Sequence, residues 1–222
     1  MGKRLRQQRR GKGAGNYRVP NYAFRPNLVY RNVGGVVTDI VKNPRMDAPL
    51  AEIAYADKTT GHLVALEGMS VGASISGTVM KLSDIKEGSI VSNVETFPNS
   101  GPKLCRAPGT FATVVSKTQK DSVIQLPSKK TKKISNDCRA MLGIPAGEGA
   151  GEKPFMKAGV MYHLKHARGK HYPTTSGLAK NAVDHPYGGS GSGKRRKQVG
   201  KSAPPGQKVG SFGARRTGRR KQ

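Results

Sequence analysis

The sequence predicts a mainly β protein in which a folded centre carries a long, basic, irregular extension at each end. Charge is the first observation: 40 Lys and Arg stand against 13 Asp and Glu in 222 residues, a formal net charge of +27. The distribution of this charge is the second observation. Residues 1–31 hold nine of the cations and no acid, residues 153–222 hold seventeen cations and one acid, and residues 32–152 are nearly neutral. Short apolar segments separated by turn residues fill that centre, and this spacing favours small barrels over helices.

The first half of the centre has the pattern of paired strands. Residues 36–41 are rich in β-branched side chains, and residues 51–55 alternate with the two-residue period of a strand. The polar segment 57–61 predicts a hairpin connection into the apolar run 62–66. A further strand is expected at 74–79.

The second half of the centre repeats this pattern. Strands are expected at 90–94, 110–115, 122–126 and 138–142, and no window shows a sustained helical period of apolar residues. The spacing leaves open one sandwich or two barrels of about sixty residues, which are marginal alone. The segment 80–84 is the expected boundary between two barrels.

Several classes of protein are excluded by composition. No run of 18 apolar residues exists, so no membrane-spanning helix is expected, and the basic segment 1–12 lacks the apolar stretch of a secretory signal. Cys105 and Cys138 are too few for a disulfide framework and fit a reducing cytosol.

The two extensions predict a polyanionic partner, because self-repulsion on this scale disfavours compaction unless the charge is neutralised. Tyr and Phe rings alternate with Arg in residues 17–25, a composition that suits stacking on unpaired bases and binding to phosphates. Nine glycines in residues 185–222 let the backbone follow an irregular groove. Solubilising tails and a general DNA-compacting or nucleic-acid chaperone protein are the alternatives.

Two motifs resemble chemical sites without completing them. Residues 188–194 match most of a phosphate-binding GxxxxGK loop, but Arg195 replaces the required Ser or Thr, so a flexible glycine segment is favoured. His163, His166 and His171 lack a CxxC partner, and hydrogen bonding or stacking on nucleic acid is favoured over zinc. No metal and no cofactor are expected.

His185 is a further candidate, because Asp184 precedes it and could orient a general base. The sequence identifies no nucleophile for such a base, since Ser176, Ser190 and Ser192 lie in no recognisable motif. A role in packing or in RNA contact is therefore favoured over catalysis.

Specific segments resemble the universal large-subunit ribosomal protein family numbered two. Residues 31–40, 43–45 and 48–51 resemble its first domain; 88–95 and 106–112 resemble its second; 181–189 resemble its signature near the active centre; and 203–210 with 214–218 resemble its closing segment. Residues 2–11 indicate the archaeal or eukaryotic branch. Tyr187, Lys180 and residues 190–197 depart from the family pattern.

The resemblance implies an OB-like barrel at 32–80 followed by an SH3-like barrel at 81–158, with basic RNA-binding extensions at 1–31 and 159–222. It implies a structural constituent of the large ribosomal subunit in the cytoplasm, one that supports subunit association and the RNA around the peptidyl-transferase centre. Its implied partners are large-subunit rRNA, neighbouring ribosomal proteins and the small subunit, without a membrane or a small-molecule substrate. No enzymatic activity is expected, because RNA performs peptide-bond formation, and His185 is expected to organise RNA.

Charge and resemblance together predict which residues bind rRNA. They are cations of the extensions with nearby histidines and glycines: Arg4, Arg6, Arg9, Arg10, Lys12, Arg18, Arg25, Lys165, His166, Arg168, Lys170, His171, His185, Gly188, Gly189, Lys194, Arg195, Arg196, Lys197, Arg215, Arg216, Arg219 and Arg220.

Overall fold

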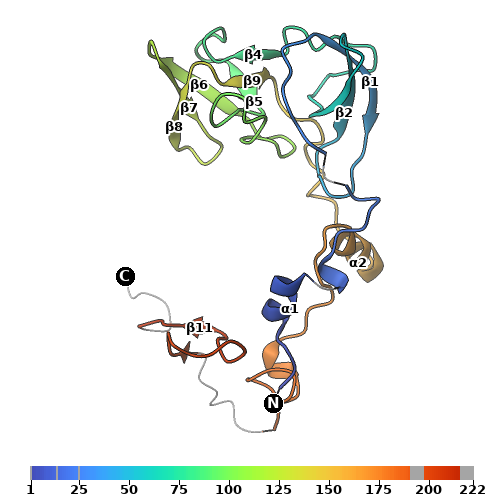
Figure 1. Ribbon diagram of the computed structural model, residues 1–222, viewed down its shortest axis with the longest axis vertical. Helices are drawn as coiled ribbons and strands as arrows, with labels where there is room; N and C mark the ends of the chain where they lie inside the picture. Colours follow the sequence, from blue (N-terminus) through green and yellow to red (C-terminus); the bar gives the residue numbers. More distant parts are fainter. Residues whose placement is uncertain (1, 14, 25, 191–197, 216–222) are drawn as a thin grey trace. The chain divides into compact units, whose positions relative to one another are not determined.

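The computed structural model describes residues 2–13, 15–24, 26–190 and 198–215, which divide into two compact units (Figure 1). Residues 21–156 form one unit, here called the β unit. The described parts of 1–20 and 157–222 form the other, here called the extension unit. No helix in the described part of the chain has the length and apolar character needed to span a bilayer.

The first sheet of the β unit contains three antiparallel strands in the order β1 (Gly35–Val41), β2 (Leu50–Tyr55) and β3 (Thr60–Val64). These strands form where β-branched and alternating apolar residues were expected. Residues 74–79 were expected as a strand, but Ser74 makes only an isolated bridge to β1. The side chains that close the inner face of this sheet are fully buried and include Val37, Ile53 and Leu63.

The second sheet has six antiparallel strands in the order β4-β9-β5-β6-β7-β8. They are β4 (Val79–Lys81), β5 (Ile90–Ser92), β6 (Ala112–Lys117), β7 (Asp121–Gln125), β8 (Thr131–Ser135) and β9 (Arg139–Leu142). Strand β8 was not expected, and β4 begins just before the expected boundary at 80–84. Inward side chains such as Val91, Val114 and Ile124 build its core.

The mainly β fold class is confirmed by these two successive antiparallel sheets. The sheets lie next to each other within the β unit (Figure 1). Met141 of β9 packs into the core of the first sheet. A backbone hydrogen bond of 2.9 Å from Ala146 to Ala65 also joins the two parts. The small cores therefore support each other, which offsets the limited burial available to a sixty-residue barrel.

The extension unit contains short helices where irregular backbone was expected. They are α1 (Arg6–Lys12) and α2 (Ala158–Ala167), accompanied by the 3₁₀ turns η1 (Gly15–Tyr17) and η2 (Gly177–Ala179) and the parallel pair β10 (Gln198–Val199) and β11 (Ser211–Phe212). Among its described apolar residues only Leu5, Ala167 and Val209 are buried. So small a core gives this unit little hydrophobic stabilisation of its own.

Candidate nucleic-acid interface

The two ends of the chain meet inside the extension unit. The Lys3 amide donates to the Val183 carbonyl at 2.7 Å, and the Lys3 ammonium lies 3.2 Å from the Asp184 carboxylate. Because the Lys3 side chain is 64 % exposed, the ion pair contributes little, and the main-chain bond sets the register. The N-terminal and C-terminal extensions, which are separate in the sequence, therefore form one surface.

Helix α1 presents arginines from a single short segment. Its N-terminus is closed by Gln8, whose Oε1 accepts from the Leu5 amide at 2.8 Å, and Leu5 is buried beneath it. Arg6, Arg9 and Arg10 follow at spacings of three and four, which place them on one side of the helix. The Arg9 Nε also donates to the Arg4 carbonyl at 3.1 Å, so the chain before the helix is held close to it.

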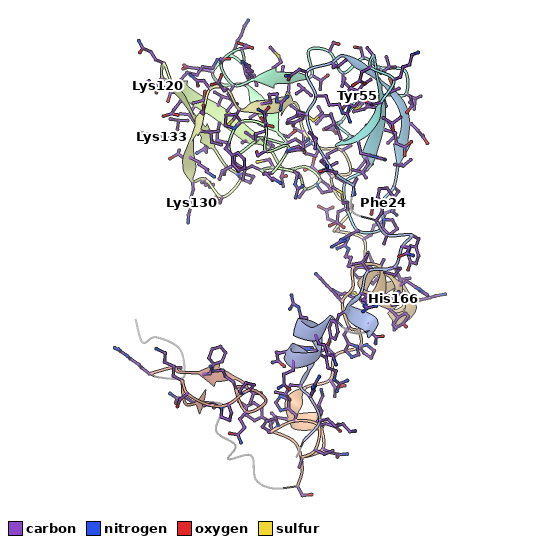
Figure 2. The ribbon with its side chains drawn as sticks, in the orientation of Figure 1. Phe24, Tyr55, Lys120, Lys130, Lys133 and His166 are labelled. Atoms are coloured by element: carbon purple, nitrogen blue, oxygen red, sulfur yellow. The ribbon has the colours of Figure 1, made fainter. Side chains whose placement is uncertain are left out.

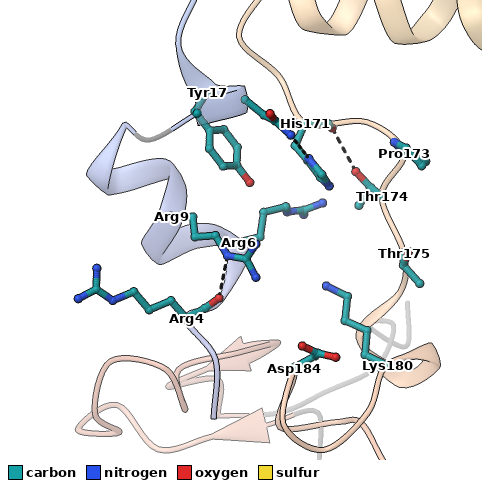
Figure 3. A pocket seen from close by; sticks show the side chains of 12 residues that line it. Arg4, Arg6, Arg9, Tyr17, His171, Pro173, Thr174, Thr175, Lys180 and Asp184 are labelled. Atoms are coloured by element: carbon teal, nitrogen blue, oxygen red, sulfur yellow. Dashed lines mark hydrogen bonds between the residues drawn. The ribbon is translucent and has the colours of Figure 1, made fainter.

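A cavity of about 420 Å³ lies between α1 and residues 171–184 (Figure 3). In Figure 3 the side chains of Arg6 and Arg9 reach toward it from the N-terminal segment, the Arg4 side chain extends outward, and Lys180 extends into it from the facing wall. Its volume falls within the range of small-ligand pockets. The lining residues are Arg4, Arg6, Arg9, Gly15, Asn16, Tyr17, His171, Pro173, Thr174, Thr175, Lys180 and Asp184.

Aromatic rings occupy one end of this arginine pocket. The Tyr17 and His171 rings have centroids 6.3 Å apart with their planes tilted by 40°, and Asn16 Nδ2 lies 3.5 Å from His171 Nδ1. The two rings already touch each other, so a nucleobase would stack on an open ring face rather than between them. Such stacking is sequence-tolerant, because every base has a π-face.

The electrostatic character of the arginine pocket is strongly positive. Arg4, Arg6, Arg9 and Lys180 line it as basic side chains, against the single carboxylate of Asp184, which Lys3 already contacts. Guanidinium groups bind phosphate oxygens in a planar fork, whereas Lys acts as a point charge. The arrangement can therefore hold phosphates beside a stacked base.

The His185 ring is fixed by the backbone that follows it. The Tyr187 amide donates to His185 Nδ1 at 3.0 Å, and the rings of these two residues lie 5.0 Å apart. Burial, with a smaller contribution from nearby Lys180, lowers the pKa of His185. The expected carboxylate partner does not orient this ring, because Asp184 pairs with Lys3 instead.

Gly188 allows the turn around His185 to close. A Cβ at this position would lie 2.2 Å from the Asn181 carbonyl oxygen and 2.3 Å from that of Lys180, so only glycine fits. The Gly188 amide donates to the His185 carbonyl at 2.8 Å, and the Gly189 amide to the Lys180 carbonyl at 3.0 Å. The two glycines therefore act here by shaping the backbone.

Helix α2 carries another group of the expected RNA-binding residues. Lys165 and His166 lie in its last turn, where the helix dipole favours positive charge, and Arg168 forms its C-cap. The His166 ring stacks on Tyr162 with centroids 6.1 Å apart and an 18° tilt. Among the described residues, no group of three or more His, Cys, Asp and Glu side chains is placed to hold a metal ion.

The structure therefore brings together only some of the residues expected to bind rRNA. Arg4, Arg6, Arg9 and His171 converge on the arginine pocket, whereas Arg10, Lys12, Arg18, Lys170 and Arg215 are exposed outside its lining. Sequence reasoning missed Asn16 and Lys180 as lining residues, since no local motif contains them. Several expected residues lie outside the described part of the chain, namely Arg25, Lys194, Arg195, Arg196, Lys197, Arg216, Arg219 and Arg220.

Known proteins similar to this chain cover its whole length. Residues 2–77 match the family model "Ribosomal Proteins L2, RNA binding N-terminal domain", and residues 75–208 match "Ribosomal Proteins L2, C-terminal domain". The large ribosomal subunit protein uL2 of Natronomonas pharaonis is 40 % identical over 236 residues, covering 99 % of this chain and 97 % of that protein. The protein of the same name from Methanothermobacter thermautotrophicus is 39 % identical over 241 residues, covering all of both chains.

Proposed function

This chain belongs to the ribosomal protein L2 family, and we propose that it is a structural constituent of the large ribosomal subunit that binds large-subunit rRNA. The observation that carries the proposal is the arginine pocket, where both ends of the chain place three arginines and a lysine beside two aromatic rings. The printed names of the relatives and of the N-terminal family model support the ribosomal and RNA-binding roles.

RNA binding in this proposal is electrostatic and positional. Arg6 and Arg9 neutralise phosphates, and each neutralised phosphate releases counterions, so affinity falls as salt rises. Tyr17 and His171 offer ring faces to an unpaired base, which fixes register without reading sequence. The small apolar core of the extension unit fits a surface that gains stability when it binds its partner.

The finer role proposed here is to support RNA architecture near the peptidyl-transferase centre and association with the small subunit. Residues 181–189, which resemble the family signature near that centre, form the tight turn closed by Gly188. We assign His185 to RNA contact, with neighbouring ribosomal proteins as further partners in this cytoplasmic particle. No chemical step is assigned to the protein, because Nδ1 of the His185 ring already accepts a hydrogen bond from the Tyr187 amide.

Binding to isolated large-subunit rRNA as a function of salt tests this function. The double variant Arg6→Gln, Arg9→Gln should lower the slope of log affinity against log salt by about 1.4 to 1.8, since each lost contact removes about 0.7 to 0.9. The matched control Lys86→Gln, Lys103→Gln removes two exposed charges from the β unit. An unchanged slope in the arginine variant, or absence of the protein from the large-subunit peak of a sucrose gradient, would refute the proposal.

A further inference from the structure

The outer face of the six-stranded sheet has the features of a second ligand surface. Ile90, Thr113, Gln125 and Thr131 are register partners in one row across β5, β6, β7 and β8. Their neighbours along the strands, such as Ile124, are buried, so the row lies on the side away from the core. Phe111, next to β6, is 40 % exposed at the same end of the sheet.

A cavity of about 310 Å³ opens on this face. It is lined by Gly109, Thr110, Phe111, Thr113, Gln125, Leu126, Pro127 and Lys129. The Thr110 hydroxyl is already used, since it donates to the Ala107 carbonyl at 2.7 Å. Within the described part of the chain, the Thr113 hydroxyl and the side-chain amide of Gln125 make no hydrogen bond. Both groups can therefore pair with a ligand. The cavity thus combines a ring surface with donors and acceptors.

Lysines lie along one side of this cavity, whose Gly109 adjoins the Glu148 carboxylate. Lys129 lines it, Lys130 follows in the same turn, and Lys132 and Lys133 continue along the edge strand β8. Figure 2 shows Lys130 and Lys133 pointing away from the sheet. All four are exposed, and none forms an ion pair with a described residue. A centre that is nearly neutral as a whole therefore contains a local concentration of positive charge.

We propose that this face, here called the lysine face, is a second RNA contact that takes an unpaired nucleotide of rRNA. The base stacks on Phe111, with its edge against Gln125 and Thr113. The adjoining phosphates lie along Lys129, Lys130 and Lys133. The inference rests on the proposed rRNA role and extends it to the C-terminal domain, whose family model is not described as RNA-binding.

The chemistry of the lysine face favours RNA over a protein partner. A protein strand added to the edge of β8 would have to pack beside Lys132 and Lys133, and lysines on an edge strand oppose such pairing. A polyanion with exposed planar rings matches both the lysines and the Phe111 cavity, because its phosphates neutralise the lysines and a base fills the cavity. Protection of the edge strand alone would explain the lysines but would not require Phe111 or its cavity.

Photocrosslinking with the full-length protein tests the inference. The probe is a ten-nucleotide oligouridylate carrying one 4-thiouridine, with crosslinked peptides mapped by mass spectrometry. Crosslinks are expected in residues 109–130, and Phe111→Leu, which keeps apolar volume but removes the ring, should abolish them. In the Arg6→Gln, Arg9→Gln background, where the extension unit no longer takes the probe, Phe111→Leu should weaken its binding about fivefold or more, because a stacked base contributes about 1–3 kcal/mol. Lys130→Gln, Lys133→Gln should lower the salt slope by about 1.4.

Two controls separate this inference from the rRNA role itself. Lys86→Gln, Lys103→Gln should leave the crosslinks in residues 109–130 in place. Arg6→Gln, Arg9→Gln should remove crosslinks in the extension unit but not those on the lysine face. Loss of extension-unit binding with no crosslink or slope change at the lysine face would overturn the inference and leave the rRNA role intact. If Lys130→Gln, Lys133→Gln aggregated but bound RNA with unchanged affinity, the inference would also be overturned. The lysines would then serve to protect the edge of β8 from pairing with another strand.

Discussion

The backbone amide of Tyr187 donates to Nδ1 of His185 at 3.0 Å, so in the neutral ring the proton is carried by Nε2. Protonation of His185 would add a hydrogen to Nδ1 that faces the Tyr187 N–H. The geometry and the burial of the ring therefore act in the same direction, and both favour the neutral imidazole.

The first prediction is that the extension unit loses stability in mild acid. The pKa of His185 is lowered below 6.5 in the folded protein, chiefly by burial, so the unfolded chain binds the proton more readily. The stabilisation is fully present above about pH 6.5 and is lost as pH falls from there through the folded pKa. An NMR titration of the histidine rings, assigned with His185→Gln, should give a midpoint below 6.5. A midpoint at or above 6.5 would contradict this prediction.

The second prediction concerns Gly188. In Gly188→Ala the new Cβ would collide with two main-chain carbonyl oxygens, which cannot move as a flexible side chain can. We expect destabilisation of the extension unit by at least the ~1–3 kcal/mol typical of overpacking. The Gly189 amide donates a hydrogen bond to the Lys180 carbonyl, so its hydrogen-exchange rate measures how often this turn opens. Gly200→Ala is the matched control, because no atom lies within 4 Å of its added Cβ, and equal exchange in the two variants would be inconsistent with the prediction.

A strand could be predicted from the sequence where one of its faces is buried and its apolar residues alternate. A strand that forms mainly by pairing with a neighbouring strand could not. Residues 51–55 alternate clearly, and β2 forms there. Strand β8 contains a single buried apolar residue, Ile134, and forms by pairing with the exposed edge of β7. Helix α2 was not predicted for a similar reason. Only Ala167 of its ten residues is buried, so its sequence does not need the apolar stripe by which an amphipathic helix is recognised.

The composition of the candidate site was more predictable than its geometry. Unbalanced charge at both ends indicated an anionic partner, and Arg6 and Arg9 were named from it. The convergence of Arg9 with Lys180 depends on long-range contacts such as the Lys3–Val183 hydrogen bond, which no local pattern encodes. The lysine face was overlooked because the charge of residues 32–152 was counted as a whole, and the acids of that range mask the run of lysines at 129–133.

A third prediction concerns the buried ion pair between Arg139 and Glu95. Glu95 is fully buried, its two oxygens accept from the backbone amides of Gly101 and Arg139 at 2.9 Å, and the Arg139 guanidinium lies 3.4 Å away. Arg139→Leu would leave this carboxylate without its cation, at a cost of about 3–5 kcal/mol in unfolding free energy. Urea unfolding followed by circular dichroism measures the change.

The controls for this prediction use a second pair and a double variant. Lys81→Gln removes an exposed ion pair with Asp137 and should cost less than about 1 kcal/mol. The double variant Glu95→Leu, Arg139→Leu should be less destabilised than the sum of its single variants, because no lone charge remains buried. If Arg139→Leu were as stable as Lys81→Gln, the pair would not have the role assigned here.

The fourth prediction is that the C-terminal extension depends on the N-terminal one for its structure. Residue 169 has no room for a Cβ, which would lie 2.9 Å from the Tyr17 carbonyl oxygen, and His171 contacts both Asn16 and Tyr17. Deleting residues 2–20 removes all of these contacts and the Lys3–Val183 bond. We expect trypsin to cleave residues 165–170 several-fold faster in the truncated protein, while cleavage within the β unit is unchanged.

Loss of charge must be separated from loss of contact in this experiment. A variant in which every Lys and Arg of residues 2–20 is replaced by Gln keeps Leu5 and Tyr17, so the two extensions can still pack together. It should retain slow cleavage at 165–170 while binding rRNA weakly, because only the charge is missing. The truncated protein should be deficient in both. Equal cleavage rates in the truncated and complete chains would mean that the two extensions fold independently, since the contacts at Tyr17 and Val183 would then contribute nothing to local order.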